Sequence, residues 1–283
     1  MLPNLIIIGA GKSGTTSLHY YLDQHPEIAM SPRKEAHFFG RDDWESRIPW
    51  YETLFQVEAP VRGEASPSYS VYPHKGDVPG RIRKLIPDAK LIYLVRDPIA
   101  RLPAHYAQQV LVGREQRSFE QALAESLRDG DDPANPYLAA SSYGTQLDRY
   151  LDKFPADQLL VIDQAEMAVD RLGTLQGVFR FLGVDDGFTT PRFEEVVYPQ
   201  KDQVRFNRFG KKLEQSRLRH AVRARVPRKL RRPVTRPMMM LLGRRVQRPS
   251  YTPELESELR ERLGPEVERL RELAGEPFAR WSL

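Results

Sequence analysis

Short apolar runs alternate with amphipathic segments along the first two thirds of the chain. The runs at 5–8, 90–95 and 158–163 are continuous and rich in Ile, Leu and Val, which is typical of strands covered on both faces. Segments in which apolar residues recur at helical spacing follow these runs. Strands that alternate with helices predict an α/β fold, in which a doubly wound parallel sheet is flanked by helices.

The helical segments have recognisable starts and stops. After the first apolar run, the helical spacing continues until Pro26. Pro98 fits a first helical position, whereas Pro103 is expected to limit or kink the helix that contains it. Residues 30–40 and 63–73 are expected to be loops. Further helices are expected at 78–87, 98–111, 118–129, 143–154, 170–184 and 252–275.

A glycine-rich loop follows the first apolar run. Residues 9–18 read GAGKSGTTSL and lie between a predicted strand and a predicted helix, which is the context of a P-loop-like phosphate site. In a nucleoside triphosphatase the lysine directly follows the second glycine, but here Thr15 holds that position and Lys12 lies inside the loop. A cation at Lys12 would stabilise a leaving phosphate oxygen as the bond to its terminal group breaks. No Walker-B aspartate is evident, since the strand at 90–95 ends in Arg96.

Composition narrows the class of protein. The 283 residues include no cysteine, which excludes a disulfide framework and a thiolate metal site and fits a reducing compartment. The N-terminus lacks the features of a signal peptide, and no segment approaches the roughly 20 apolar residues that span a bilayer. We therefore expect a cytoplasmic protein with a single domain. Its parts are a core at about 4–200, a basic helical lid or insertion at about 205–248 and a C-terminal helix at about 252–275.

The segment 205–248 is strongly basic. It holds 16 Lys and Arg residues and one acid, Glu214, so it carries +15 while the rest of the chain carries −10 of the total +5. Three interpretations are open: a solvated cationic face, a nucleic-acid site, or a lid that contacts the acceptor or an anionic membrane surface. The segment has no recognisable nucleic-acid-binding module, so we expect no specific nucleic-acid partner. We favour the lid or a peripheral membrane contact.

Four ordered motifs resemble those of sulfotransferases that use 3′-phosphoadenosine 5′-phosphosulfate as donor. GAGKSGTTSL is similar to the family's 5′-phosphosulfate loop, and LIYLVRDPIARLPAHY to its 3′-phosphate segment. PRKEAHFF resembles the K-E-x-H-F-F stretch of the carbohydrate, heparan-type branch. YGTQLDRYLDKFPADQLLVIDQAEM and VFRFLGV resemble the later helix, strand and F-L-G helix. The resemblance runs from about residue 4 to 185 and is greatest to the carbohydrate and bacterial branch.

This resemblance implies a role for each matching residue. Glu35 would be the base that deprotonates an acceptor hydroxyl, His37 would shape the site beside it, and Lys12 would stabilise the departing phosphate. Arg96 would bind the 3′-phosphate with support from Arg101. The phosphosulfate end of the donor would be held by Lys12, Ser13, Gly14, Thr15, Thr16 and Ser17. The reaction that the resemblance implies requires no metal ion.

The sequence departs from the family pattern at two positions. Ala104 stands where the family usually has a serine that contacts the 3′-phosphate, and Ala65 stands where carbohydrate members often have a lysine. The family's late K-G-R-x-H-like loop is not found. A carbohydrate, a glycolipid and a glycosylated natural product therefore remain open as acceptors, although PRKEAHFF favours a sugar hydroxyl. The sequence predicts no oligomeric state.

Two other functions are kept as alternatives. A P-loop kinase or NTPase would bind ATP with Mg²⁺, but the position of Lys12 disfavours it. A non-catalytic protein that binds anionic surfaces would depend on residues 205–248.

The pKa of Glu35 is also open at this point. Desolvation by Phe38 and Phe39 would raise it toward that of a useful base, whereas the charges of Arg33 and Lys34 would lower it. The alternative for Glu35 itself is a solvated carboxylate with no catalytic role.

Overall fold

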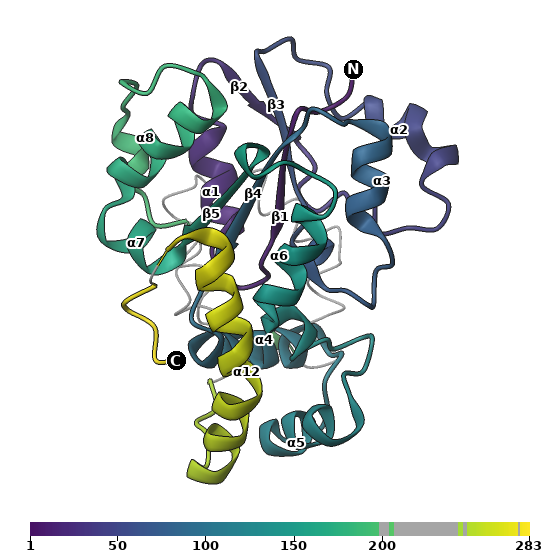
Figure 1. The fold of residues 1–283 in the computed structure, drawn as a ribbon, viewed down its shortest axis with the longest axis vertical. Coiled ribbons are helices and arrows are strands. Elements are labelled where there is room, and N and C mark those ends of the chain that lie inside the picture. The colour runs from purple at the N-terminus through teal and green to yellow at the C-terminus, as the bar shows by residue number, and fades with distance from the viewer. Residues whose placement is uncertain (198–203, 207–242, 246–247, 277) are drawn as a thin grey trace.

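A computed structural model describes residues 1–197, 204–206, 243–245, 248–276 and 278–283. Within them, a parallel sheet has the strand order β2-β3-β1-β4-β5 and carries helices on both faces (Figure 1). The strands are β1 (Leu5–Gly9), β2 (Ile28–Met30), β3 (Val61–Ala65), β4 (Lys90–Val95) and β5 (Leu159–Asp163). The predicted doubly wound α/β fold is thus confirmed.

Helices and short 3₁₀ turns connect the strands. The expected helices are all present, with boundaries that differ by a few residues. The elements predicted were α1 (Thr15–Leu22), α3 (Val78–Leu85), α4 (Pro98–Val112), α5 (Phe119–Asp129), α6 (Tyr143–Leu151), α8 (Arg171–Leu182) and α12 (Pro253–Ala274). The elements that were not predicted are η1 (Glu45–Arg47), α2 (Ile48–Glu52), η2 (Pro67–Ser70), η3 (Ala139–Ser141), η4 (Ala156–Gln158), α7 (Gln164–Val169) and η5 (Pro191–Glu194).

Alternate residues of the central strands pack on opposite faces of the sheet. On β1, Ile6 and Ile8 join a core with α3, α6 and α12, whereas Leu5 and Ile7 join a second core with α1 and α8. The residues of β4 divide in the same way. Because both faces are covered, residues 5–8 and 91–95 of these strands are all apolar or aromatic, and that is why the sequence pattern predicts them well.

One segment predicted to be a loop is partly a strand. Residues 63–65 belong to β3, which pairs with β1 and β2. The prediction was wrong because V-R-G-E-A contains no apolar run. Gly63 leaves room for a neighbouring side chain, since a Cβ there would lie 2.5 Å from Met30 Sδ. Glu64 is wholly buried, although a carboxylate is not a residue expected in a central strand.

Helix α4 passes through Pro103 and ends only at Val112. A proline in a helix has no N–H for the carbonyl four residues earlier, which here belongs to Ile99. The Tyr251 hydroxyl donates to that carbonyl oxygen at 2.7 Å. Of the two effects expected of Pro103, a helix end and a kink, the helix end is therefore wrong, because a distant side chain replaces the missing donor.

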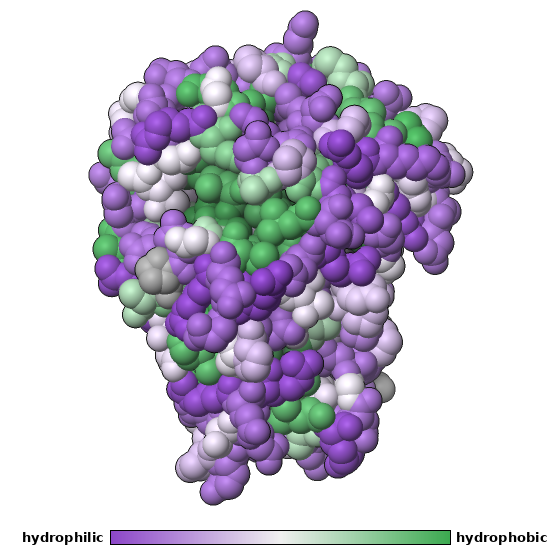
Figure 2. All heavy atoms as spheres, viewed as in Figure 1, coloured by the Kyte–Doolittle hydropathy of each residue, from purple (hydrophilic) through white to green (hydrophobic). Residues whose placement is uncertain are grey.

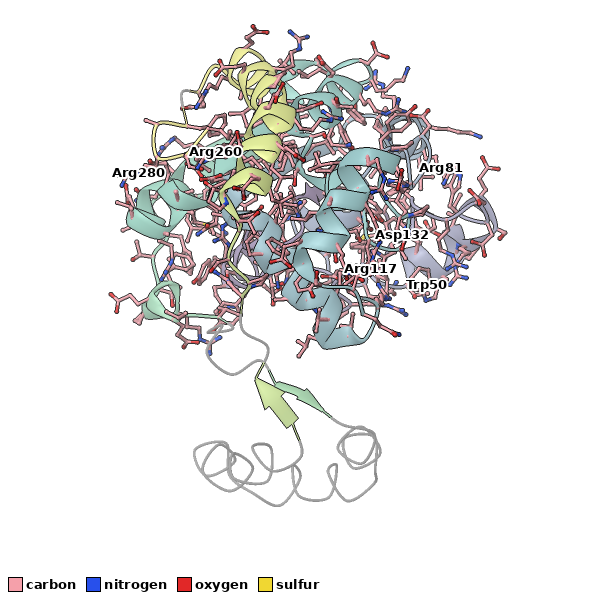
Figure 3. The ribbon with its side chains drawn as sticks, turned by 90° about the horizontal axis from the view of Figure 1, so that it is seen from below. Trp50, Arg81, Arg117, Asp132, Arg260 and Arg280 are labelled. Carbon is pink, nitrogen blue, oxygen red and sulfur yellow. The ribbon has the colours of Figure 1, made fainter. Side chains whose placement is uncertain are left out.

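The later part of the chain contains a separate two-stranded sheet and the helix α12. Strands β6 (Val204–Phe206) and β7 (Gly243–Arg245) pair antiparallel and stand at the periphery of the body (Figure 3). Most of the predicted basic lid at 205–248 lies outside the described residues. After it, Thr252 accepts a hydrogen bond from the Leu255 amide at the start of α12. No helix in the described ranges combines the length and apolar character needed to cross a bilayer.

One face of the molecule carries an apolar hollow over the upper part of the sheet, framed by polar side chains (Figure 2). Strand β5 forms one edge of the sheet, and its residues Leu159, Leu160 and Val161 are only partly buried. A large cleft of the molecule lies at the carboxyl ends of the strands, which is where open α/β sheets bind ligands.

Candidate active site

A cleft of about 1670 Å³ lies at the carboxyl ends of the strands. Its walls come from the loop after β1, the segment after β2, the end of β4 and the helices α4 and α7. The predicted site residues all line it: Lys12, Ser13, Gly14, Thr15, Thr16, Ser17, Glu35, His37, Arg96 and Arg101. The fold thus brings three distant motifs to one place.

The loop between β1 and α1 presents the start of a helix to the cleft. Gly14, which precedes α1, has a φ of 100°, a left-handed conformation that favours glycine, and no side chain caps this helix. The first amides of α1 therefore lack an intrahelical acceptor, and the positive end of the helix dipole faces the cleft. Thr16 and Ser17 line the cleft at the same end. Such an arrangement binds phosphate groups.

Cationic side chains converge on this loop. Burial and the charges of Arg248 and Arg96 lower the pKa of Lys12, and burial and the charge of Arg248 lower the pKa of Arg96. Lys12 has a φ of 70°, and its Nζ donates to Gln108 Oε1 at 3.2 Å. An anion with several charges would relieve the repulsion among these cations, of which Lys12 and Arg96 are partly buried.

Arg101, on α4, is fully buried and hydrogen-bonded to the protein itself. Its Nη1 donates to the carbonyl oxygen of Gly11 at 3.2 Å. Its Nη2 donates to the carbonyl oxygen of Tyr137 at 2.9 Å and to Ser141 Oγ. Arg101 therefore links the phosphate loop, α4 and the segment before α6.

Glu35 has a φ of 63°, and its amide donates to the Ala65 carbonyl oxygen at 2.9 Å. Its Oε1 lies 2.6 Å from Lys34 Nζ. Partial burial raises the pKa of Glu35, but the hydrogen bond and charge of Lys34, together with the charges of His37 and Lys12, leave it below its ordinary value. The pKa of Glu35, which the sequence left open, is therefore lowered overall, because the neighbouring charges outweigh burial.

His37 lies beside Glu35 and is oriented by a serine. Its Nδ1 is 2.8 Å from Ser68 Oγ, and its Nε2 is 3.7 Å from Glu35 Oε2. Burial lowers the pKa of His37 more than the Glu35 charge raises it, so a neutral imidazole faces the carboxylate at neutral pH. The next two residues, Phe38 and Phe39, are wholly buried in the core.

Some residues of the site belong to no motif that the sequence analysis used. Gln108 contacts Lys12 and lies seven residues after Arg101, so it shares a face of α4 with that arginine. Helical spacing could have identified it. Arg248 acts on both Lys12 and Arg96, but within a segment of 16 cationic residues nothing singles it out.

The sequence of residues 2–229 matches the sulfotransferase domain family. The chain belongs to this family. It is 32% identical over 195 residues to the mouse (Mus musculus) heparan sulfate glucosamine 3-O-sulfotransferase 3A1, a match covering 68% of this chain and 48% of that protein. It is 30% identical over 215 residues to the bovine (Bos taurus) bifunctional heparan sulfate N-deacetylase/N-sulfotransferase 2, covering 69% of this chain and 24% of that protein.

A solved structure agrees with the fold of this sulfotransferase-family chain. The crystal structure of a sulfotransferase from Alicyclobacillus acidocaldarius superimposes with a TM-score of 0.71 at 28% identity and covers all of both chains. By contrast, this chain spans about half or less of the length of the two curated relatives described above.

The donor of the sulfotransferase family, 3′-phosphoadenosine 5′-phosphosulfate, carries anionic groups at two ends, and the residues present fit both. The uncapped start of α1 and Lys12 suit the phosphosulfate end. Arg96, whose pKa is lowered by the charge of Arg248, suits the 3′-phosphate. The fit between these residues and the ligand rests on the uncapped start of α1 and on the cations that repel one another.

Proposed function

We propose that this protein transfers a sulfuryl group from 3′-phosphoadenosine 5′-phosphosulfate to an acceptor hydroxyl. The observation that carries the proposal is the convergence of Lys12 and Glu35 in one cleft, where the charge of each shifts the pKa of the other. In-line transfer needs a cation on the side of the leaving phosphate and a base on the side of the attacking oxygen.

The donor supplies the sulfuryl group, and the chain supplies its position. Lys12 would stabilise the negative charge that grows on the leaving phosphate. Arg96 would bind the 3′-phosphate, and Arg248 would provide the contact for which Ala104 has no hydroxyl. Arg101 would hold the loop. The 5′-phosphate would be bound by the amides and hydroxyls of Ser13, Gly14, Thr15, Thr16 and Ser17.

Glu35 would take the proton of the acceptor hydroxyl as its oxygen attacks sulfur. The lowered pKa keeps the carboxylate ionised, and a base of this strength receives the proton late, when the oxygen–sulfur bond is well formed. His37 would keep the carboxylate in place from the side of Oε2. No metal ion takes part in the proposed reaction.

The decisive test is transfer of labelled sulfate from the donor to a panel of acceptors. Lys12→Ala should abolish turnover, and Glu35→Gln should nearly abolish it while adenosine 3′,5′-bisphosphate still binds. Full activity in Glu35→Gln would remove Glu35 from the mechanism. Mg²⁺-dependent binding of ATP in place of the bisphosphate would instead favour a P-loop kinase or NTPase.

The acceptor that we propose is a sugar hydroxyl. The names of the mouse and bovine relatives refer to heparan sulfate, and the segment that contains Glu35 resembles the carbohydrate branch. A panel of free glycans, glycolipids and glycosylated natural products, with the products located by mass spectrometry, tests this proposal. Sulfation of hydroxyls without any attached sugar, and of no glycan, would contradict it.

A cytoplasmic location and a peripheral membrane contact through 205–248 are also proposed. The net charge of +15 on that segment supports attraction to anionic lipid. Co-sedimentation should increase with vesicles that contain phosphatidylserine and weaken with salt, whereas neutral vesicles serve as the control. Equal binding to both kinds of vesicle would contradict the electrostatic contact.

A further inference from the structure

Glu64 is a buried carboxylate that has no role in the reaction as proposed. It lies on β3 and is wholly buried. The hydroxyls of Tyr51 and Tyr69 donate to its Oε1 at 2.9 Å and 2.8 Å, and the Ser66 hydroxyl donates to its Oε2 at 2.7 Å. Burying a carboxylate costs free energy that such hydrogen bonds only partly offset. The hydrogen bonds that this cluster makes to other segments indicate its role.

Two of these hydroxyls also accept hydrogen bonds from the loop that contains the proposed base. The His37 amide donates to Ser66 Oγ at 3.1 Å, and the Phe39 amide donates to the Tyr69 hydroxyl at 3.2 Å. A hydroxyl has a single proton. Because both protons are directed at Glu64, Ser66 and Tyr69 can only accept from the loop. The loop amides can only donate, so the carboxylate fixes the orientation of the two hydroxyl groups, whose lone pairs are left facing these amides.

This loop needs external support. Glu35 and His37 both have left-handed backbone conformations, with φ of 63° and 51°, which are unfavourable for residues with a Cβ. The amides of residues 35, 37 and 39 donate hydrogen bonds to the β3–η2 segment, and the Glu35 amide donates to the Ala65 carbonyl oxygen. The Phe38 ring stacks on Tyr51 with a centroid distance of 3.9 Å.

We propose that Glu64 is a positioning residue for sulfuryl transfer. Through Ser66 and Tyr69 it holds the backbone of residues 35–39 and so places the Glu35 carboxylate in the cleft. This inference rests on the proposed function, since it requires Glu35 to be the base. Glu64 is absent from the described lining of the cleft, so its loss should affect the transfer step and spare donor binding.

Glu64→Gln tests the proposal because it keeps the shape of the side chain. Its NH₂ group cannot accept a hydroxyl proton, so at least one of the three hydroxyls must turn away. We expect kcat to fall on the order of 10- to 100-fold, as for a misplaced reacting group, with unchanged affinity for adenosine 3′,5′-bisphosphate. In a Glu35→Gln background the same change should cost little more, because no base is left to misplace.

Tyr51→Phe is the matched control. It removes a hydroxyl from the same carboxylate oxygen and keeps the ring that stacks on Phe38, but no loop amide depends on that hydroxyl. Its kcat should stay near that of the wild type. Ser66→Ala and Tyr69→Phe each remove an acceptor of a loop amide and should reproduce the loss of kcat. They keep the test open if Glu64→Gln does not fold.

The inference would be overturned by an equal loss of nucleotide affinity in Glu64→Gln, by losses that multiply with those of Glu35→Gln, or by a Tyr51→Phe defect as large as that of Ser66→Ala. An inactive wild-type protein would contradict the proposed function instead. Wild-type activity with kcat unchanged in Glu64→Gln would refute the positioning role alone.

Discussion

The Lys34 ammonium group lies 2.6 Å from Glu35 Oε1, and this ion pair, together with the charges of His37 and Lys12, outweighs the effect of burial on the carboxylate. Lys34→Met removes both the hydrogen bond and the charge, so the pKa of Glu35 should rise. The wild-type carboxylate, with its lowered pKa, stays ionised to a lower pH than an ordinary glutamate. In the variant it is protonated at higher pH, and the acidic limb of the kcat/KM profile should move upward in pH.

Lys75→Met is the control for this shift. Lys75 lines the same cleft, but its charge acts on His37. The acidic limb assigned to Glu35 should therefore stay in place in Lys75→Met. An acidic limb that is the same in Lys34→Met as in the wild type would show that Glu35 does not titrate in the rate.

Gly11→Ala probes the space in front of the phosphate loop. A Cβ at Gly11 would meet no other atom within 4 Å, so the free energy of unfolding should hardly change. If the donor occupies that space, the methyl group should weaken binding of adenosine 3′,5′-bisphosphate by about tenfold, or about 1.4 kcal/mol, in calorimetry. Gly264→Ala on α12 also adds a methyl group to open space and should leave binding unchanged. Equal affinities in the two variants would place the donor elsewhere.

Predictions from the sequence succeeded where the determining pattern is local. Residues 5–8 of β1 and 91–95 of β4 are all apolar or aromatic because both faces are covered, and the loop after β1 has the residues of an anion site. Strand β3 was missed because Arg62, Gly63 and Glu64 leave it without an apolar run. The burial of Glu64 is made tolerable by hydroxyls from α2 and η2, which no local pattern reveals.

The hydrogen-bond partners of Arg101 likewise could not be predicted from the sequence. The resemblance implied support for a phosphate, but which groups its guanidinium meets depends on the packing of three segments. Candidate residues could be named from motifs, whereas their partners, such as Gln108 for Lys12, required the fold.

Arg101→Lys should therefore destabilise the protein. A lysine cannot span the carbonyl oxygens of Gly11 and Tyr137 as the guanidinium fork does, and buried acceptors left unpaired cost about 1–3 kcal/mol each. Urea denaturation should show a loss in that range, and nucleotide affinity should fall because the loop is released. Arg114→Lys, at an exposed arginine of the same cleft, should leave stability unchanged. Wild-type stability in Arg101→Lys would indicate that the arginine acts through its charge alone.

Glu115 should make the stability of the protein depend on pH. Its side chain is nearly buried between α4 and α5, where Arg117 contacts both carboxylate oxygens at 2.9 Å and 2.7 Å and the Tyr137 hydroxyl donates at 3.1 Å. Arg117 is labelled in Figure 3. Burial raises the pKa of Glu115, but the hydrogen bonds from Arg117 and its neighbours lower it to about 2.

A carboxyl group whose pKa is lower in the folded state stabilises the protein above its unfolded pKa of 4.5. The shift from 4.5 to about 2 corresponds to about 3 kcal/mol. Glu115→Gln should therefore lower the free energy of unfolding by about that amount at pH 7, and the difference should shrink as the pH falls from 4.5 toward 2. Urea denaturation at several pH values measures this dependence.

Asp129→Asn, at a fully exposed pair with Arg128, is the control and should show little change. A deficit in Glu115→Gln that stays constant down to pH 2 would mean that lost packing, rather than the ionised carboxylate, accounts for the effect.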